Sequence, residues 1–327
     1  MKNKHIYRKL KLIACFYLFI CAVTPVNAQM KTNHLPGDAS LQSGTQAPPS
    51  IIAFIPVYNF HTSTFKDKEG NSVGNPDLNV FFTGIGGSIV TNFKILGGNW
   101  GASLLIPFSS SKIEGGEVSS KGSLAFTDIY VQPVQLGWHT KQADFEAGYA
   151  LYLPTGKYTM GADGNTGLGM VTHEFSGGTT LYFDKKKEWH FAALFSYALN
   201  SAKNNTMDNK IKVGNVLTIE GGLGKTWYKP VKGTEVPMVI NAGLTYYIQS
   251  KLTDDEIKIP AISGYAFDLS KDHIYGLGAE ANILFPKTFT SLSVRWLGEM
   301  GAKNRFQGNT FFITLAQFLK SLEKKKS

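Results

Sequence analysis

The chain has 327 residues, of which 43% are hydrophobic and 17% charged, and its formal net charge is +9. Five of the 33 Lys and Arg residues lie in the first 28 positions, which hold no Asp or Glu, so loss of that segment lowers the charge to +4. So small a basic excess gives no support for a nucleic-acid partner. Both cysteines, Cys15 and Cys21, lie in the same segment, which excludes a disulfide framework from the remaining chain.

The first 28 residues predict a cleaved secretory signal peptide. A basic start is followed by the apolar run Leu12 to Val23 and by the small-residue site Val26-Asn27-Ala28, after which we expect cleavage. The run is shorter than the roughly 20 residues that a membrane-spanning helix needs. Residues 29–50 are polar and contain three prolines, which predicts a flexible arm or a plug in the lumen of the domain that follows. Residues 319–327 predict a charged, solvated tail.

Residues 51–318 predict one all-β domain, a transmembrane antiparallel β-barrel of about twelve strands in the outer membrane of a Gram-negative-type bacterium. The expected strands are 51–60, 80–94, 100–108, 124–138, 144–153, 173–183, 189–200, 212–225, 237–250, 273–283, 288–297 and 310–318. Connections after the even-numbered strands are short, and those after the odd-numbered strands are long and polar. Outer-membrane barrels have short periplasmic turns and long extracellular loops, so we expect both ends of the mature chain in the periplasm.

Side-chain alternation supports this interpretation. In 144–153, Phe145, Ala147, Tyr149 and Leu151 share the face expected to contact outer-membrane lipid, and Glu146 lies on the other. Aromatic residues also lie at strand ends, where an interfacial girdle places them: Trp100, Trp138, Trp189, Trp227 and Tyr228. A soluble sandwich would need no such girdle.

The same parity directs a set of ionisable side chains into the lumen. They are Asp128, Glu146, Glu174, Glu220, Glu280 and Arg295. Charges in this position can line a permeation path and bias what passes. The alternative is that they form ion pairs that only make the wall rigid, because buried ionisable groups normally need partners.

Two other functions are weighed against transport. His61 and Ser63 are two residues apart and share a face of an extended chain, as in an outer-membrane lipid hydrolase, although a polar strand end gives the same pattern. A sealed structural barrel whose loops bind a partner is the second alternative. The seven histidines form no closely spaced ligand pair, so we expect neither a metal site nor another cofactor.

Three segments together resemble the outer-membrane transporter family named for the meta-pathway of phenol degradation. They are residues 97–107, 126–138 and 152–158, which include the matching positions Asp128, Pro133, Trp138, Pro154, Thr155, Gly156 and Tyr158. The resemblance implies an outer-membrane barrel associated with uptake of aromatic or other hydrophobic compounds, without known catalytic residues. The architectural interpretation of the same positions is a bulge at Pro133, a strand end at Pro154 and a turn at Gly156.

These observations predict a porin-like barrel that gives passive passage to small hydrophobic or aromatic compounds. No nucleotide-binding loop is present in the sequence, so we expect a diffusion route. We expect no enzymatic activity, with a serine-type lipid hydrolase at His61 and Ser63 as the alternative. A barrel of twelve strands is wider than the eight-stranded kind that side chains fill and narrower than an open porin. We therefore expect a gate made by residues 29–50 or by an infolded loop.

Overall fold

The fold is described from a computed structural model, for residues 31–39, 41–115, 118–159, 162, 164–203, 210–258 and 271–323. The predicted signal peptide and the last four residues of the charged tail lie outside these ranges. Within these ranges, no helix is long and apolar enough to cross a membrane.

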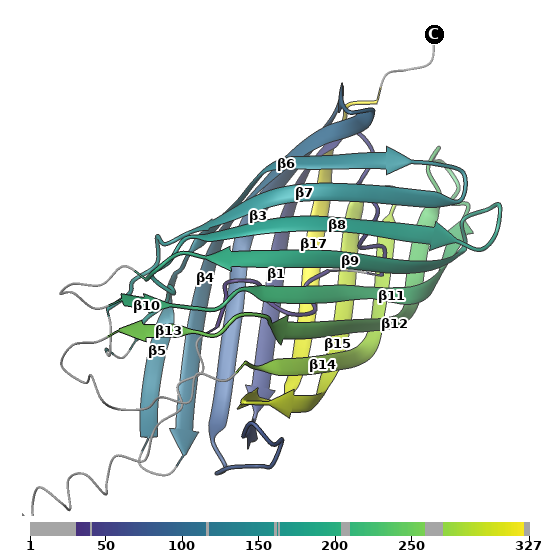
Figure 1. The fold of residues 1–327 in the computed structure, drawn as a ribbon. Coiled ribbons are helices and arrows are strands. Elements are labelled where there is room, and N and C mark those ends of the chain that lie inside the picture. The colour runs from purple at the N-terminus through teal and green to yellow at the C-terminus, as the bar shows by residue number, and fades with distance from the viewer. Residues whose placement is uncertain are drawn as a thin grey trace, which may run out of the picture.

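Twelve antiparallel strands form a closed barrel (Figure 1). They are β1 (Ser50–Thr62), β3 (Asp77–Ile95), β4 (Gly98–Gly115), β6 (Ile129–His139), β7 (Ala143–Leu153), β8 (Thr172–Tyr182), β9 (Trp189–Asn200), β11 (Val216–Lys229), β12 (Met238–Lys251), β14 (His273–Phe285), β15 (Thr290–Lys303) and β17 (Asn309–Ser321). Each pairs with the next, and β1 pairs with both β3 and β17, which closes the sheet. The predicted fold class and strand number are confirmed.

The barrel has one end with short turns and one with long connections, here called the turn end and the loop end. The turn-end connections are residues 96–97, 140–142, 183–188, 230–237 and 286–289. Leu96 and Gly97 both have positive φ, 50° and 82°, as a two-residue hairpin turn requires. All five residues of the predicted aromatic girdle lie near the turn end, and Trp189, Trp227 and Tyr228 are exposed there.

Three expectations about the strands are wrong in detail. The strand expected at 124–138 is interrupted at Thr127-Asp128, which separates β5 (Val118–Phe126) from β6. The connection expected after residue 108 is instead a β4–β5 hairpin that continues the sheet beyond β6. The last loop is short, because β15 continues to Lys303 and the strand β16 (Arg305–Phe306) follows immediately and pairs with β2 (Phe65–Lys66). Strands β10 (Lys210–Lys212) and β13 (Glu256–Lys258) also pair with each other in the long connections.

The outer wall is apolar. Large exposed hydrophobic side chains recur at alternate positions of successive strands, among them Ile55, Ile85, Phe145, Phe175, Phe195, Leu223, Leu244, Leu277, Trp296 and Leu315. Exposed apolar side chains around the outside of a closed barrel are the surface that lipid covers. The outward set predicted for 144–153 agrees with Phe145, which is 44% exposed.

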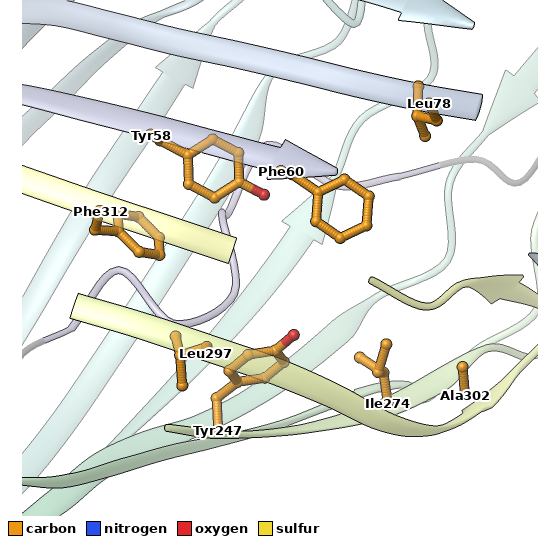
Figure 2. Packing of buried hydrophobic residues seen from close by; sticks show 8 residues of the cluster. All are labelled: Tyr58, Phe60, Leu78, Tyr247, Ile274, Leu297, Ala302 and Phe312. Carbon is orange, nitrogen blue, oxygen red and sulfur yellow. The ribbon is translucent and has the colours of Figure 1, made fainter. Parts of the chain in front are cut away.

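A hydrophobic cluster lies inside the barrel near the loop end. Tyr58, Phe60 and Phe312 come from β1 and β17, and they pack with Tyr247, Ile274 and Leu297 of the adjoining strands β12, β14 and β15 (Figure 2). The rings of Tyr58 and Phe312 meet edge to face at 4.8 Å between centroids. The cluster narrows the lumen at this end.

Residues 31–39 and 41–49, here called the N-terminal segment, run through the lumen along the barrel axis (Figure 1). At the loop end, Thr32 donates a hydrogen bond to Asn200, the last residue of β9, and Asn33 donates one to Thr172, the first residue of β8. At the turn end, Thr45 and Gln46 contact Asp144 and Gln135. The first described residue, Lys31, therefore lies at the loop end, so the expectation that both ends of the chain lie at the turn end is wrong for this part of the N-terminus.

Candidate functional site

A histidine of the N-terminal segment connects it to two strands of the wall. His34 Nδ1 lies 2.7 Å from Glu174 Oε2 on β8, and His34 Nε2 lies 2.7 Å from Glu220 Oε1 on β11. Burial lowers the pKa of His34. The carboxylates of Glu174, Asp38 and Glu220 together raise this pKa by more than burial lowers it, so it lies well above its ordinary value. The ring is therefore an imidazolium that donates a hydrogen bond to each carboxylate.

The kink at Gly37 is held from opposite sides. Its backbone N–H donates to Glu220 Oε2 at 2.9 Å, and its carbonyl oxygen accepts a hydrogen bond from Arg295 on β15. Arg295 Nε also donates to Glu280 Oε2 at 2.7 Å, and both of these side chains are buried. Gly37 has φ of +82°, and a Cβ there would lie 2.4 Å from Leu297, so only glycine fits. Charged side chains of the wall thus bind the backbone of the segment.

The turn end of the segment sits on a small residue of the wall. A Cβ added to Gly137 of β6 would lie 2.5 Å from Cβ of Gln46, so the absence of a side chain at Gly137 makes the space that Gln46 occupies. Gln46 Nε2 donates to the carbonyl oxygen of Gln135 at 3.2 Å. Thr45 Oγ1 donates to Asp144 Oδ2 at 3.2 Å. Both ends of the segment are therefore anchored to the wall.

One group of side chains has the composition of a metal site. Ligand atoms of His34, Asp38 and Glu220 all lie within 4.8 Å of one another, and this is the one such group among the described residues. Both ring nitrogens of His34 are already engaged by carboxylates, however, and Glu220 Oε2 accepts from Gly37 and Ala39. The arrangement joins the N-terminal segment to the wall by ion pairs. A metal ion could bind only if it displaced the proton of the imidazolium.

A cavity of about 610 Å³ lies between the N-terminal segment and the wall formed by β17, β1, β3, β4, β6, β7, β8 and β9. One side of the cavity is apolar and includes Phe54, Tyr58, Phe82, Leu105 and Phe312. The other side is polar and includes Asp38, Gln132, Gln135, Glu146 and Glu174. The two sides together make an amphipathic space large enough for a small organic molecule.

Five of the six ionisable residues singled out from the sequence fall into three arrangements. Glu174 and Glu220 hold His34, and Glu280 is paired with Arg295. Glu146 lines the cavity and accepts a hydrogen bond from Gln135 Nε2 at 3.3 Å. The structure therefore brings four of the six to the N-terminal segment, either directly or through Arg295.

Asp128 lies at the strand interruption and binds backbone of the connection between β7 and β8. Its two carboxylate oxygens accept from Gly156 N at 3.0 Å and Leu168 N at 2.8 Å. Thr155 Oγ1 donates to the carbonyl oxygen of Thr127 and accepts from Ile129 N, both at 3.0 Å. Asp128, Thr155 and Gly156, three positions of the family resemblance, thus form one clamp across the interruption.

The other positions of the resemblance have structural contacts. The pairing of β6 with β7 shifts register between Val131 and Val134, beside Pro133. Trp138 Nε1 donates to the carbonyl oxygen of Leu96 in the first turn at 3.0 Å. Strand β7 ends at Leu153, just before Pro154. The ring of Tyr158 lies 4.9 Å from Lys203 Nζ.

The hydrolase pair is only partly assembled. His61 is exposed on the outer side of β1, and its Nδ1 lies 3.6 Å from Asp77 Oδ1. Among the described residues, His61 makes no hydrogen bond with Ser63, which is exposed beyond the end of the strand. The structure thus adds an acidic neighbour to His61 without bringing the serine to it.

Reasoning from the sequence missed His34, Asp38 and Gln46, which lie in a segment without secondary structure. Their partners are 89 to 186 residues away in the chain, so no local spacing connects them. One local pattern could have identified His34 and Asp38 from the sequence. In His34-Leu35-Pro36-Gly37-Asp38, one ionisable side chain precedes the turn dipeptide Pro36-Gly37 and one follows it.

A closed, twelve-stranded antiparallel barrel with an apolar outer wall defines a β-barrel of the outer-membrane type. The chain belongs to the family described as "Putative MetA-pathway of phenol degradation", which matches residues 62–315. The family resemblance predicted from the sequence is thereby confirmed. No match was found among curated proteins.

Two solved structures illustrate the likeness in fold. The COG4313 outer membrane channel from Pseudomonas putida F1 is 13% identical, with a TM-score of 0.66 over 87% of this chain and 99% of that one. The β domain of the Bordetella autotransporter BrkA is 11% identical, with a TM-score of 0.50 over 83% of this chain and 100% of that one. At these identities the comparison concerns the barrel fold alone.

Proposed function

We propose that this barrel lies in the outer membrane, after export by a signal peptide cleaved at Ala28, and gives passive passage to small hydrophobic or aromatic molecules. The observation that carries the proposal is the amphipathic cavity. Its apolar side offers aromatic rings such as Phe54 and Phe82. An aromatic solute that packs against these rings is stabilised by about 25 cal/mol for each Å² of apolar surface that it buries. Membership of a family named for phenol degradation supports the same substrate class.

The N-terminal segment is the gate in this proposal. It occupies the lumen from Lys31 to Pro49 and is held at His34, Gly37 and Gln46 by side chains and backbone of the wall. Hydrogen bonds and ion pairs can be broken and remade without disturbing the strands, whose pairing is separate from them. A local displacement of the segment would widen the path along the lumen while the barrel stays closed.

The first test is entry of a solute panel into liposomes that contain the purified barrel, compared with empty liposomes. The panel contains aromatic, aliphatic and sugar molecules of similar size, and the folded barrel is verified by its mobility on a gel before and after heating. Selective and saturable entry of the aromatic members is the expected result. Entry of no solute would reject passive passage and favour a sealed structural barrel.

The gate is tested by joining the segment to the wall. The exchanges Gln46→Cys and Gly137→Cys place two thiols on facing positions of the segment and the wall. The two Cβ positions lie 2.5 Å apart, so the segment must move away from β6 by about 1 Å to reach the roughly 3.8 Å Cβ separation of a disulfide. The only native cysteines precede residue 28, so no other thiol competes after cleavage. We expect oxidation to slow entry and reduction to restore it, whereas each single exchange should respond to neither. Unchanged entry in the oxidised double variant would reject the segment as gate.

A further inference from the structure

The cavity carries more acidic than basic groups. Four carboxylates line it, from Asp38, Asp128, Glu146 and Glu174, against the two basic side chains of Lys31 and His34. Lys31 lies at the loop end, where its Nζ is 5.7 Å from the ring of Phe60 and 5.6 Å from that of Phe306. His34 is shared between Glu174 and a further carboxylate, Glu220. Carboxylates therefore outnumber basic side chains around the cavity.

Glu146 and Asp38 account for most of this imbalance. Within the part of the chain that the structure describes, neither forms an ion pair with a basic side chain. The one hydrogen bond to the Glu146 carboxylate comes from the neutral amide of Gln135. The Asp38 side chain is exposed to the cavity, and it accepts no hydrogen bond from a described residue.

Glu174 adds a third acceptor. It is only 7% exposed, and its Oε2 is engaged by His34, whereas no hydrogen bond of the described residues reaches its Oε1. A carboxylate that is removed from bulk water and left without a cation is costly, and the cost falls when a cation binds. Glu146 has no cation beside it among the described residues, and Asp38, Glu174 and Glu220 share the single imidazolium of His34, so carboxylates are in excess in a space whose other side is made of aromatic rings.

We propose that the cavity selects hydrophobic amines, with the cationic group held by Asp38, Glu146 and Glu174 and the apolar body packed against Phe54, Phe82 and Phe312. This inference rests on the proposed passage of hydrophobic molecules and narrows their class. The rings of Tyr58 and Phe82 also favour a cation, through their electron-rich faces. Carboxylic acids and sulfonates of the same shape meet the like charge of the same three groups and are disfavoured.

The test compares permanently charged solutes, which do not cross lipid unaided. Entry of benzyltrimethylammonium, benzenesulfonate and tetramethylammonium is measured at pH 9, where the carboxylates of the cavity are ionised, in liposomes with and without the barrel. We expect benzyltrimethylammonium to enter about tenfold faster than benzenesulfonate, within the range that charged clefts produce. Tetramethylammonium has the charge without the ring, and it should enter more slowly than benzyltrimethylammonium.

Variants locate the effect. The double exchange of Asp38→Asn with Glu146→Gln keeps the shape of both side chains and should reduce the preference for cation over anion to near unity. Glu69→Gln is the matched control, because Glu69 is an exposed carboxylate in the connection after β1 and is absent from the cavity lining. Asp38→Asn alone gives an independent reading, because Asp38 is outside every strand.

The outcomes separate the two proposals. Equal entry of cation and anion, while neutral aromatic solutes enter, would overturn the preference for amines and leave passive passage intact. Equal entry of tetramethylammonium and benzyltrimethylammonium would also overturn it, because the carboxylates would then be a simple cation filter. Absence of any aromatic entry would reject passive passage, and the amine inference would fall with it.

Discussion

His34 of the N-terminal segment lies 2.7 Å from Glu220 of β11, although 186 residues separate them in the chain. The second ring nitrogen of His34 lies equally close to Glu174 of β8, and Glu220 also accepts from the backbone of Gly37. One imidazolium thus neutralises part of the charge of two wall carboxylates and ties the segment to both strands. The segment therefore depends on a charge that a single exchange can remove.

Replacement of His34 by Ala should release the N-terminal segment. The exchange leaves Glu174 and Glu220 without their shared cation, and breaking a buried ion pair in this way costs about 3 to 5 kcal/mol. Because the strands keep their pairing, we expect the loss to appear as local opening, with exchange of the Gly37 and Ala39 amide protons faster by about 100-fold or more.

Hydrogen exchange detects the opening, and single-channel conductance should rise in parallel. His61→Ala is the control, because His61 is exposed and lies outside the lumen. Unchanged amide exchange at Gly37 in the His34 variant would show that Arg295 and Glu220 hold the segment without the histidine.

Replacement of Asp128 by Ala should loosen the connection between β7 and β8. The exchange leaves the backbone N–H groups of Gly156 and Leu168 without their acceptor, and an unsatisfied buried donor costs about 1 to 3 kcal/mol. We expect faster exchange of these two amide protons, with amides in the centre of β11 unaffected.

Asp67→Ala is the control for this effect, because Asp67 accepts a backbone hydrogen bond from Asn71 in a different connection. Protection of Gly156 and Leu168 that is equal in the Asp128 variant and the native chain would mean that Thr155 alone maintains the clamp.

The barrel was predictable from the sequence because its signals are local. Alternation of Phe145 with Glu146 and the short connection at Leu96-Gly97 can be recognised within a few residues, and the structure agrees with both. The interruption at Thr127-Asp128 was not predictable in this way. Thr127 accepts a hydrogen bond from Thr155 and donates one to the carbonyl oxygen of Thr166, and these partners are 28 and 39 residues away in the chain.

Only the residues that the strands contribute to the site could be predicted from the sequence. Strand parity directed Glu174, Glu220 and Arg295 to the lumen, but the partners of these residues on the N-terminal segment follow no periodic pattern. Polarity and prolines predicted an arm or a plug over residues 29–50, but the position of His34 between two carboxylates is a tertiary contact across the lumen.

A serine-directed fluorophosphonate probe should not label the protein. A nucleophilic serine needs a base within hydrogen-bond reach, and His61 contacts Asp77 instead of Ser63 in the described structure. The matched comparison is the native chain against Ser63→Ala, with phospholipid release from vesicles measured in parallel. Labelling that disappears in the Ser63 variant, together with lipid hydrolysis, would establish the hydrolase alternative.

Stability of the N-terminal segment should decrease as the pH rises through neutrality. Burial in the lumen and the adjacent carboxylate of Glu220 raise the pKa of Asp38 from 3.8 to about 7, whereas His34 and Arg295 oppose this rise. A carboxyl with a raised pKa in the folded state contributes stability that is fully present below its unfolded pKa. This contribution is lost as the pH rises through about 7, where ionised Asp38 repels Glu220 and Glu174.

We therefore expect amide exchange at Ala39, corrected for its intrinsic pH dependence, to reveal more opening at pH 8 than at pH 5.5. His34 has a pKa well above its ordinary value and stays charged over most of this window, so Asp38 dominates the change. Asp38→Asn removes the titrating group and should make the opening independent of pH between these limits. An equal pH dependence in the Asn variant and the native chain would assign the effect to another group of the lumen.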